Sequence, residues 1–133
     1  MNISEYVKKR FTEGDKFLAL LGVQVESASH EQTVCSIRLK KEEHYNAGGG
    51  VQGGVLYTLA DMAFALAANC SGNETVTLSG AIRYIAKTEG KKLTATATLT
   101  KATRKICFYE VKISDDLDVL IATADFTGYI LKG

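Results

Sequence analysis

The sequence contains no proline. This excludes cis-proline turns and proline-rich linkers between domains. Internal repeats and low-complexity tracts are also absent. A chain of 133 residues is long enough to bury a substantial core yet fits one domain. We therefore predict a single domain over residues 1–133.

Neither sign of charge dominates the chain. Sixteen lysines and arginines stand against fifteen aspartates and glutamates, and the formal net charge is +1. A dedicated nucleic-acid-binding protein needs a basic surplus, so no nucleic-acid partner is expected. A local basic patch for a phosphorylated small molecule remains compatible with this balance. The hydrophobic fraction of 46% is that of a folded globular protein.

Cysteine and histidine are scarce. The three cysteines, Cys35, Cys70 and Cys107, form no CxxC or Cys/His spacing, so no metal site is expected. No signal-peptide pattern precedes them, and reduced packing thiols in a cytoplasmic protein are the natural interpretation. Of the two histidines, His30 falls in a predicted turn and is expected to be solvated. His44 precedes a glycine-rich loop and could instead reach a substrate.

The most informative stretch runs from Asn46 to Asn73. Its glycine-rich loop leads into residues 53–70, which are apolar on nearly every side. Such a helix is either wrapped by its own protein or inserted in a membrane. Asp61 is the only charged residue of the stretch, and its central position argues against a membrane span. A buried carboxylate is costly unless it is hydrogen-bonded, paired or used in chemistry, and burial should raise its pKa. A catalytic Asp61 and a structurally satisfied one are both open at this point.

The other segments predict an α+β fold. Residues 3–12 have the periodicity of an amphipathic helix outside the main body, and Gly22 is a stop signal. Strand patterns occupy residues 23–25, 33–39 and 75–86, and residues 41–52 form a loop before the apolar helix. Apolar residues alternate with threonines from 93 to 100, and two more strands follow after short turns. This pattern predicts an antiparallel meander.

A curved sheet of five or six strands covers only one side of an apolar helix. The uncovered side and the edges of the sheet predict a partner subunit, most economically an identical one. We therefore expect a homodimer.

A family resemblance rests on the apolar helix and the strands after it. They carry the pattern Asn46-x5-Gln52-Gly53-Gly54-x4-Leu59-Ala60-Asp61, then a long strand and a three-strand meander. In this the chain resembles the hotdog-fold thioesterases, and especially their PaaI-like, phenylacetic-acid-degradation branch. The resemblance implies a hotdog fold, in which a curved antiparallel sheet wraps around one long central helix and an N-terminal helix lies outside. It also implies homodimers that assemble into homotetramers, and hydrolysis of acyl-CoA thioesters with no metal or organic cofactor.

The same resemblance implies a role for each residue of the site. Asp61 would be the general base or the nucleophile, and the Gly53 or Gly54 N–H would polarise the thioester oxygen. Asn46 would place the attacking water or the substrate, and a hydroxyl of the following strand, Thr77 or alternatively Ser79, would assist. Elementary chemistry agrees, because a helix N-terminus offers free N–H groups and a partial positive charge to a developing oxyanion. These sites form across the dimer interface in the family.

Gln52 departs from the family pattern, which usually has histidine before the glycine pair. Glutamine donates and accepts hydrogen bonds but does not titrate near neutral pH. The sequence is therefore compatible with two functions, an acyl-CoA thioesterase and a non-catalytic acyl-CoA-binding protein. A hotdog dehydratase is a third, weaker reading, because it needs a histidine–acid pair and no histidine lies near the helix motif.

Further residues are candidates for holding the substrate. The aromatic ones are predicted to line an acyl pocket, with core packing as the alternative. The basic ones are predicted to dock the phosphates of CoA, with ordinary surface charge as the alternative. The candidates are Tyr45, Tyr57, Arg83, Lys101, Arg104 and Lys105.

Overall fold

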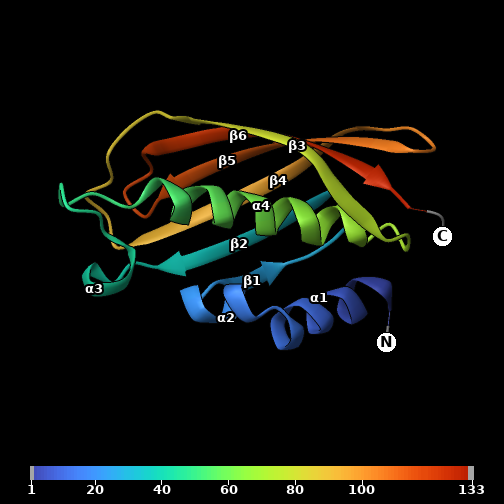
Figure 1. Cartoon of the computed structure of the whole chain (residues 1–133), viewed down its shortest axis with the longest axis horizontal. Helices are drawn as coiled ribbons and strands as arrows, with labels where there is room; N and C mark the ends of the chain where they lie inside the picture. The colour runs from blue at the N-terminus through green and yellow to red at the C-terminus, as the bar shows by residue number, and fades with distance from the viewer. Residues whose placement is uncertain (1, 132–133) are drawn as a thin grey trace.

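The computed structural model describes residues 2–131, in which a six-stranded antiparallel sheet wraps over one long helix (Figure 1). The strand order is β1-β2-β4-β5-β6-β3. The helices are α1 (Ile3–Gly14), α2 (Lys16–Leu21), α3 (Lys41–His44) and α4 (Gly53–Asn69). The strands are β1 (Gln24–Ser27), β2 (Gln32–Arg38), β3 (Thr75–Tyr84), β4 (Lys92–Ala102), β5 (Ile106–Asp115) and β6 (Leu120–Ile130). The predicted α+β arrangement is confirmed.

The N-terminal segment forms two helices. In α1 the Asn2 side chain accepts from the Glu5 N–H at 2.8 Å, and the Glu5 carboxylate accepts from the Asn2 N–H, which completes a capping box. Asp15 separates the helices because its carboxylate caps α2, accepting from the Leu18 N–H at 2.9 Å. The second helix ends at Gly22 as predicted, with a φ of 76° that suits glycine. Both helices lie outside the sheet (Figure 1).

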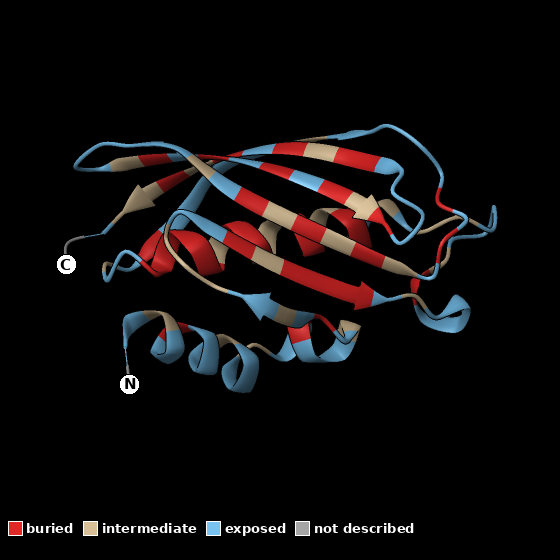
Figure 2. Cartoon of the chain, turned by 180° about the vertical axis from the view of Figure 1, so that it is seen from behind, coloured by how far each residue is buried: buried red, intermediate tan, exposed pale blue. Residues whose placement is uncertain are grey.

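The predicted alternation of strand residues is confirmed. In β4 the side chains of Leu93, Ala95 and Ala97 are fully buried, and β4 packs against α4. The threonines between them are partly or fully exposed on the opposite face, and Figure 2 shows this alternation along the strands. β4, β5 and β6 pair in sequence as the predicted meander. Burial of one face of each strand against α4 therefore builds the core.

β3 pairs with β6, with Tyr84 opposite Ala122. The chain then crosses the end of the sheet through residues 85–91 before it enters β4 (Figure 1). β3 is consequently an edge strand, and its Val76 and Leu78 side chains are 44% and 56% exposed. An edge that shows apolar side chains and unpaired backbone groups is a template for pairing with another chain.

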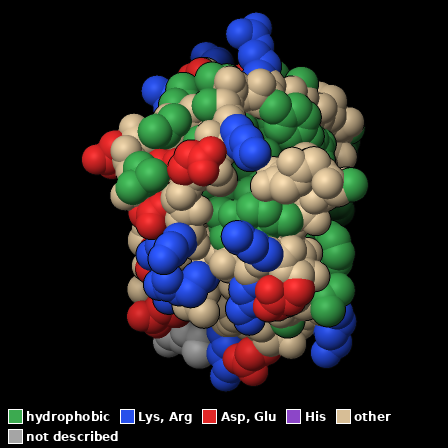
Figure 3. Space-filling view, turned by 90° about the vertical axis from the view of Figure 1, so that its left-hand side faces the viewer, with side chains coloured by type: hydrophobic (Ala, Val, Ile, Leu, Met, Phe, Trp, Pro, Cys, Tyr) green, Lys and Arg blue, Asp and Glu red, His purple; other side chains and the backbone are tan. Residues whose placement is uncertain are grey.

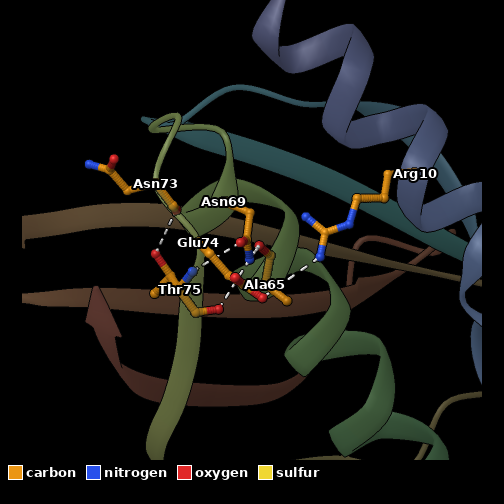
Figure 4. Close-up of polar contacts among 6 residues, drawn as sticks. All are labelled: Arg10, Ala65, Asn69, Asn73, Glu74 and Thr75. Carbon is orange, nitrogen blue, oxygen red and sulfur yellow. Dashed lines mark hydrogen bonds and ion pairs between the residues drawn. The ribbon is translucent and has the colours of Figure 1, made fainter. Parts of the chain in front are cut away.

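Asn69 fixes the start of β3 to the last turn of α4 (Figure 4). Its amide nitrogen donates to the Ala65 carbonyl at 2.8 Å, and its amide oxygen accepts from the Thr75 N–H at 3.0 Å. Nearby, an exposed ion pair of 4.0 Å joins Arg10 to Glu74, although pairs of this kind contribute little to stability. The Asn69 amide therefore sets where β3 begins relative to α4.

A buried polar cluster closes the end of the sheet at which α4 begins. The Thr88 hydroxyl donates to Asp115 Oδ2 at 2.7 Å, and Asp115 Oδ1 accepts from the Leu117 and Val119 N–H groups at 2.9 and 3.0 Å. Burial by itself would raise the pKa of Asp115, but these hydrogen bonds outweigh it and hold the pKa below its ordinary value. Asp115 thus ties the segment after β3 to the β5–β6 turn.

We expect Asp115→Asn to lower the free energy of unfolding by about 1–3 kcal/mol at neutral pH, because the buried Thr88 hydroxyl loses its acceptor when an amide nitrogen replaces Oδ2. A carboxyl whose pKa is lowered by folding stabilises the fold above its unfolded-state pKa. That contribution is lost as the pH falls through the lower, folded-state pKa. Below about pH 4 the wild type should therefore lose stability more steeply than the variant. Urea unfolding at pH 7 and pH 3 measures this, with the exposed Asp125→Asn as control. Equal pH dependence in wild type and Asp115→Asn would contradict the assignment.

Candidate active site

The first turn of α4 carries two backbone donors that are unpaired within the described part of the chain. Gln52 is the N-cap residue, and its side chain makes no capping hydrogen bond. The Val55 and Leu56 N–H groups donate back to the Gln52 carbonyl at 2.9 and 3.4 Å. Within residues 2–131 the N–H groups of Gly53 and Gly54 have no acceptor. These donors, at the positive end of a helix dipole, suit a negatively charged oxygen.

Asn46 organises the glycine-rich loop before α4. Its Oδ1 accepts from the Gly48 and Gly50 N–H groups at 3.0 and 3.1 Å, and its backbone carbonyl accepts from the Gly49 N–H at 3.1 Å. The N–H groups of all three loop glycines are therefore satisfied within the loop. Because the Asn46 oxygens are occupied in this way, its Nδ2 donors are what it can offer to a ligand.

A pocket of about 580 Å³ opens where this loop, the first turn of α4 and the segment after β3 meet. Figure 3 faces this end of the molecule and shows apolar surface bordered by Lys and Arg side chains. The pocket is lined by Asn46, Gly48, Gly50, Val51, Gly53, Leu56, Tyr84, Ile85, Ala86, Lys87, Thr88 and Ile121. Gly53, whose N–H is predicted from the sequence to be an oxyanion donor, thus lines a cavity large enough for part of a substrate.

Tyr84 is a pocket residue that the sequence reasoning missed. Its hydroxyl donates to the Gly53 carbonyl at 3.2 Å. A Cβ added at Gly53 would lie 3.1 Å from this hydroxyl, so Tyr84 and a larger residue at position 53 compete for space. Strand alternation places Tyr84 toward α4 and the neighbouring Arg83 on the opposite face of the sheet. The same alternation, applied to residues 82–84 of the sequence, was the signal that could have identified it.

Asp61 lies two turns into α4 and is half-buried. Burial raises the pKa of its carboxyl, interaction with the Thr77 hydroxyl partly offsets this, and the charge of Asp15 raises the pKa further. The catalytic roles of Asp61 and Thr77 stay predictions. No sequence pattern links Asp15, which caps α2, to Asp61.

Tyr57 lies on α4 one turn before Asp61. Burial raises the pKa of its phenol, and the charges of Asp61 and Tyr84 add to this effect. Its ring packs edge-on against Phe126 with centroids 5.5 Å apart, and a Cβ at Gly80 would overlap its hydroxyl. Tyr57 therefore belongs both to the core and to the surface that carries Asp61.

Gly54 and Asp61 cannot meet on one reacting group within a single chain. They are seven residues apart on the same helix, which corresponds to about 10 Å along its axis at 1.5 Å per residue. Seven residues at about 100° each return to nearly the same face, so both groups lie along one stripe. An oxyanion donor and a base must each approach the reacting group to about 3 Å. Within one chain the two groups are therefore too far apart to act on the same reacting group.

Some predicted substrate-binding residues lie away from the pocket of their own chain. Lys101, Arg104 and Lys105 are in the β4–β5 hairpin, at the end of the sheet where α4 finishes (Figure 1). Tyr45 pairs with Val51 at the base of the glycine-rich loop and does not line the cavity. The structure brings neither Tyr45 nor the hairpin cations into the pocket.

Both histidines serve the fold. His44 is buried, its Nδ1 accepts from the Lys40 N–H at 2.9 Å, and its Nε2 donates to the Leu21 carbonyl at 3.0 Å. His30, expected to be solvated, is in fact half-buried, with Nδ1 3.2 Å from the Ala67 carbonyl near the end of α4. The solvated prediction was wrong because a turn in sequence can still pack against a helix end. Neither ring reaches the pocket.

The three cysteines are buried and reduced. Across the described part of the chain, no three His, Cys, Asp or Glu side chains gather closely enough to hold a metal ion. No helix between residues 2 and 131 has the length and hydropathy to cross a membrane.

The chain is similar in sequence to known proteins. The model of the thioesterase superfamily matches residues 48–122. A protein of Archaeoglobus fulgidus named "Putative esterase" is 33% identical over 126 residues, which cover 94% of this chain and 81% of the relative.

Solved structures agree with the predicted hotdog fold. The E. coli PaaI protein from the phenylacetic acid degradation operon superimposes with a TM-score of 0.91 at 22% identity, over 98% of this chain and 95% of that one. A hypothetical thioesterase protein with coenzyme A from Streptococcus pneumoniae gives a TM-score of 0.83 at 24% identity, over 92% and 95%. The hotdog fold of the PaaI-like type, predicted from the helix motif and the meander, is confirmed.

Proposed function

The chain belongs to the thioesterase superfamily, and we propose that it hydrolyses acyl-CoA thioesters to a free acid and CoA. The proposal rests on the presence of an oxyanion donor and a carboxyl on the same helix, α4. Two unpaired glycine N–H groups stand at its start, and a half-buried carboxyl with a raised pKa follows two turns later. The presence of coenzyme A in the S. pneumoniae relative supports CoA as the thiol.

In the proposed reaction the thioester oxygen lies against the N–H groups of Gly53 and Gly54. Asp61 takes a proton from water as the water oxygen attacks the thioester carbon. Alternatively its carboxylate attacks the carbon directly, and water then hydrolyses the resulting acyl-aspartate anhydride to release the acid and restore Asp61. The negative charge on the carbonyl oxygen is then stabilised by the two N–H groups. When the C–S bond breaks, the CoA thiolate leaves and takes up a proton.

Gln52 has a suitable position in this scheme. It is the N-cap of α4, it is exposed, and its side chain is not used to cap the helix. Its amide N–H can therefore join Gly53 in donating to the thioester oxygen, a role that needs no titration. Proton transfer is left to Asp61, with the Thr77 hydroxyl beside it.

The second half of each site is proposed to come from an identical partner. Antiparallel pairing of two β3 edges sets two α4 helices side by side in opposite directions. Asp61 of one chain then lies opposite the partner subunit's Gly54. The exposed apolar side chains of β3 and the half-buried stripe of Tyr57, Asp61 and Met62 on α4 support this arrangement.

We expect the purified protein to release free CoA from at least one member of a panel of aromatic, short-chain and medium-chain acyl-CoAs. Thiol-reactive absorbance measures the release, and the uncatalysed rate in buffer is the control. If calorimetry detects binding of acyl-CoA and no thiol appears over hours, the non-catalytic acyl-CoA-binding function replaces the thioesterase. That alternative is motivated by Gln52 in place of the family histidine.

A further inference from the structure

Lys87 stands at the mouth of the pocket, opposite the glycine-rich loop. Its Cε and Cγ lie 3.7 and 4.0 Å from the place where a Cβ on Gly50 would be. The aliphatic stem of the lysine therefore extends over Gly50 along the pocket wall. A Cβ at position 50 would make ordinary van der Waals contact with this stem, so the stem and the loop form one continuous wall.

The backbone on both sides of Lys87 is held in place. Before it, the Ile85 and Ala86 N–H groups donate to the Ile121 carbonyl at 2.8 and 3.2 Å. After it, the buried Thr88 donates to Asp115 at 2.7 Å. Lys87 is thus an exposed cation on a fixed segment, and little backbone freedom is lost when it binds a ligand.

The charge of Lys87 is not neutralised by the protein. Within residues 2–131, no carboxylate oxygen lies within 4.0 Å of its ammonium group. The opposite wall adds Asn46, whose Oδ1 is occupied by loop N–H groups while its Nδ2 offers donors. This part of the pocket therefore presents a positive charge and hydrogen-bond donors, which is the chemistry that binds phosphate.

We propose that Lys87 binds a phosphate of the CoA moiety at the pocket mouth, an inference that rests on the proposed thioesterase function. The thioester lies at the Gly53 end of the pocket, and the pantetheine arm crosses the apolar wall formed by Leu56, Tyr84 and Ile85. Lys87 is a binding residue and has no part in bond making or breaking. Lys101, Arg104 and Lys105 lie in the β4–β5 hairpin, away from the pocket of their own chain.

We expect Lys87→Ala to raise the KM for acyl-CoA on the order of tenfold, with kcat nearly unchanged, because one charge-assisted contact to the substrate is lost. The same acyl group on N-acetylcysteamine has no phosphate, and its KM should not change. Lys87→Arg should retain most of the affinity. The control Lys112→Ala removes an equal charge from the exposed face of β5 and should leave both substrates unaffected. Acyl-dephospho-CoA separates the two phosphate sources, because it lacks the 3′-phosphate and keeps the pyrophosphate.

An unchanged KM for acyl-CoA in Lys87→Ala would overturn the proposal, and so would an equal rise for both thioesters, which indicates a structural role. If the wild type hydrolyses neither ester, the thioesterase function fails while the Lys87 site is still measurable. In that case calorimetry with CoA decides the matter. A roughly tenfold weaker Kd in Lys87→Ala than in Lys112→Ala supports the phosphate site, and equal Kd values exclude it.

Discussion

Asp61→Asn should lower the rate of thioester hydrolysis by roughly 10²–10⁴-fold, the usual contribution of a positioned general base. Asparagine keeps the shape of the side chain but accepts no proton and cannot act as a nucleophilic carboxylate. The Gly53 and Gly54 N–H groups remain in place. Substrate binding should therefore persist, and the loss should appear in kcat more than in KM.

The same substitution should stabilise the fold at neutral pH. The folded state raises the pKa of Asp61, so the ionised carboxylate is less favourable in the folded than in the unfolded chain. The penalty develops as the pH rises from the unfolded-state pKa through the folded-state pKa, and it is complete above both. Asparagine carries no charge and removes this penalty. A substitution that raises stability and lowers activity is typical of a residue that serves function at a cost in stability.

Thiol-release kinetics and urea unfolding at pH 7 measure the two effects, with Asp125→Asn on the exposed face of β6 as the matched control. For the wild type, kcat should fall at acid pH with a midpoint above the ordinary pKa of an aspartate, because Asp61 must be ionised to act. Full turnover by Asp61→Asn would remove this residue from the mechanism.

Mixed dimers should recover activity that neither parent variant has. Gly53→Pro removes one oxyanion donor, at the first helical position, where proline is tolerated best. Gln52 before it has φ −60° and ψ 133°, which a following proline also allows. The exposed Tyr84 ring must shift slightly to admit the new side chain. Alone, this variant should lose about 10²–10³-fold in kcat.

When Asp61→Asn and Gly53→Pro chains are combined, each mixed dimer has one intact site if the two groups come from different subunits. The other site carries both substitutions. Random pairing gives half mixed dimers, so about a quarter of the wild-type activity should return. Co-expression with two different affinity tags isolates the mixed dimer, and the two parent variants are the controls. Activity no higher than that of the parents would show that both groups serve the same chain's site.

Several properties of this protein follow from local sequence. The alternation of Leu93, Ala95 and Ala97 with threonines gives each side chain of β4 its face, because a strand has a period of two residues. The apolar run over residues 53–70 predicts the central helix, which is observed as Gly53–Asn69. The interruption by Asp61 singles out the carboxyl that the fold leaves half-buried. Each of these depends only on residues near one another in the chain.

Other properties depend on contacts between distant segments. The pairing of β3 with β6 leaves the strand after the helix at an edge, and no local pattern in residues 75–84 distinguishes that from a place beside β4. The pocket joins Lys87 and Tyr84 to the Gly50 and Gly53 region across more than thirty residues of chain. His30 and His44 became structural because the carbonyls of Ala67 and Leu21 happen to face them. The periodicity of side chains thus determined the helices and strands and the catalytic candidate. The tertiary packing of those elements decided which edge of the sheet is free and which residues share the pocket. It also decided which polar groups already have hydrogen-bond partners.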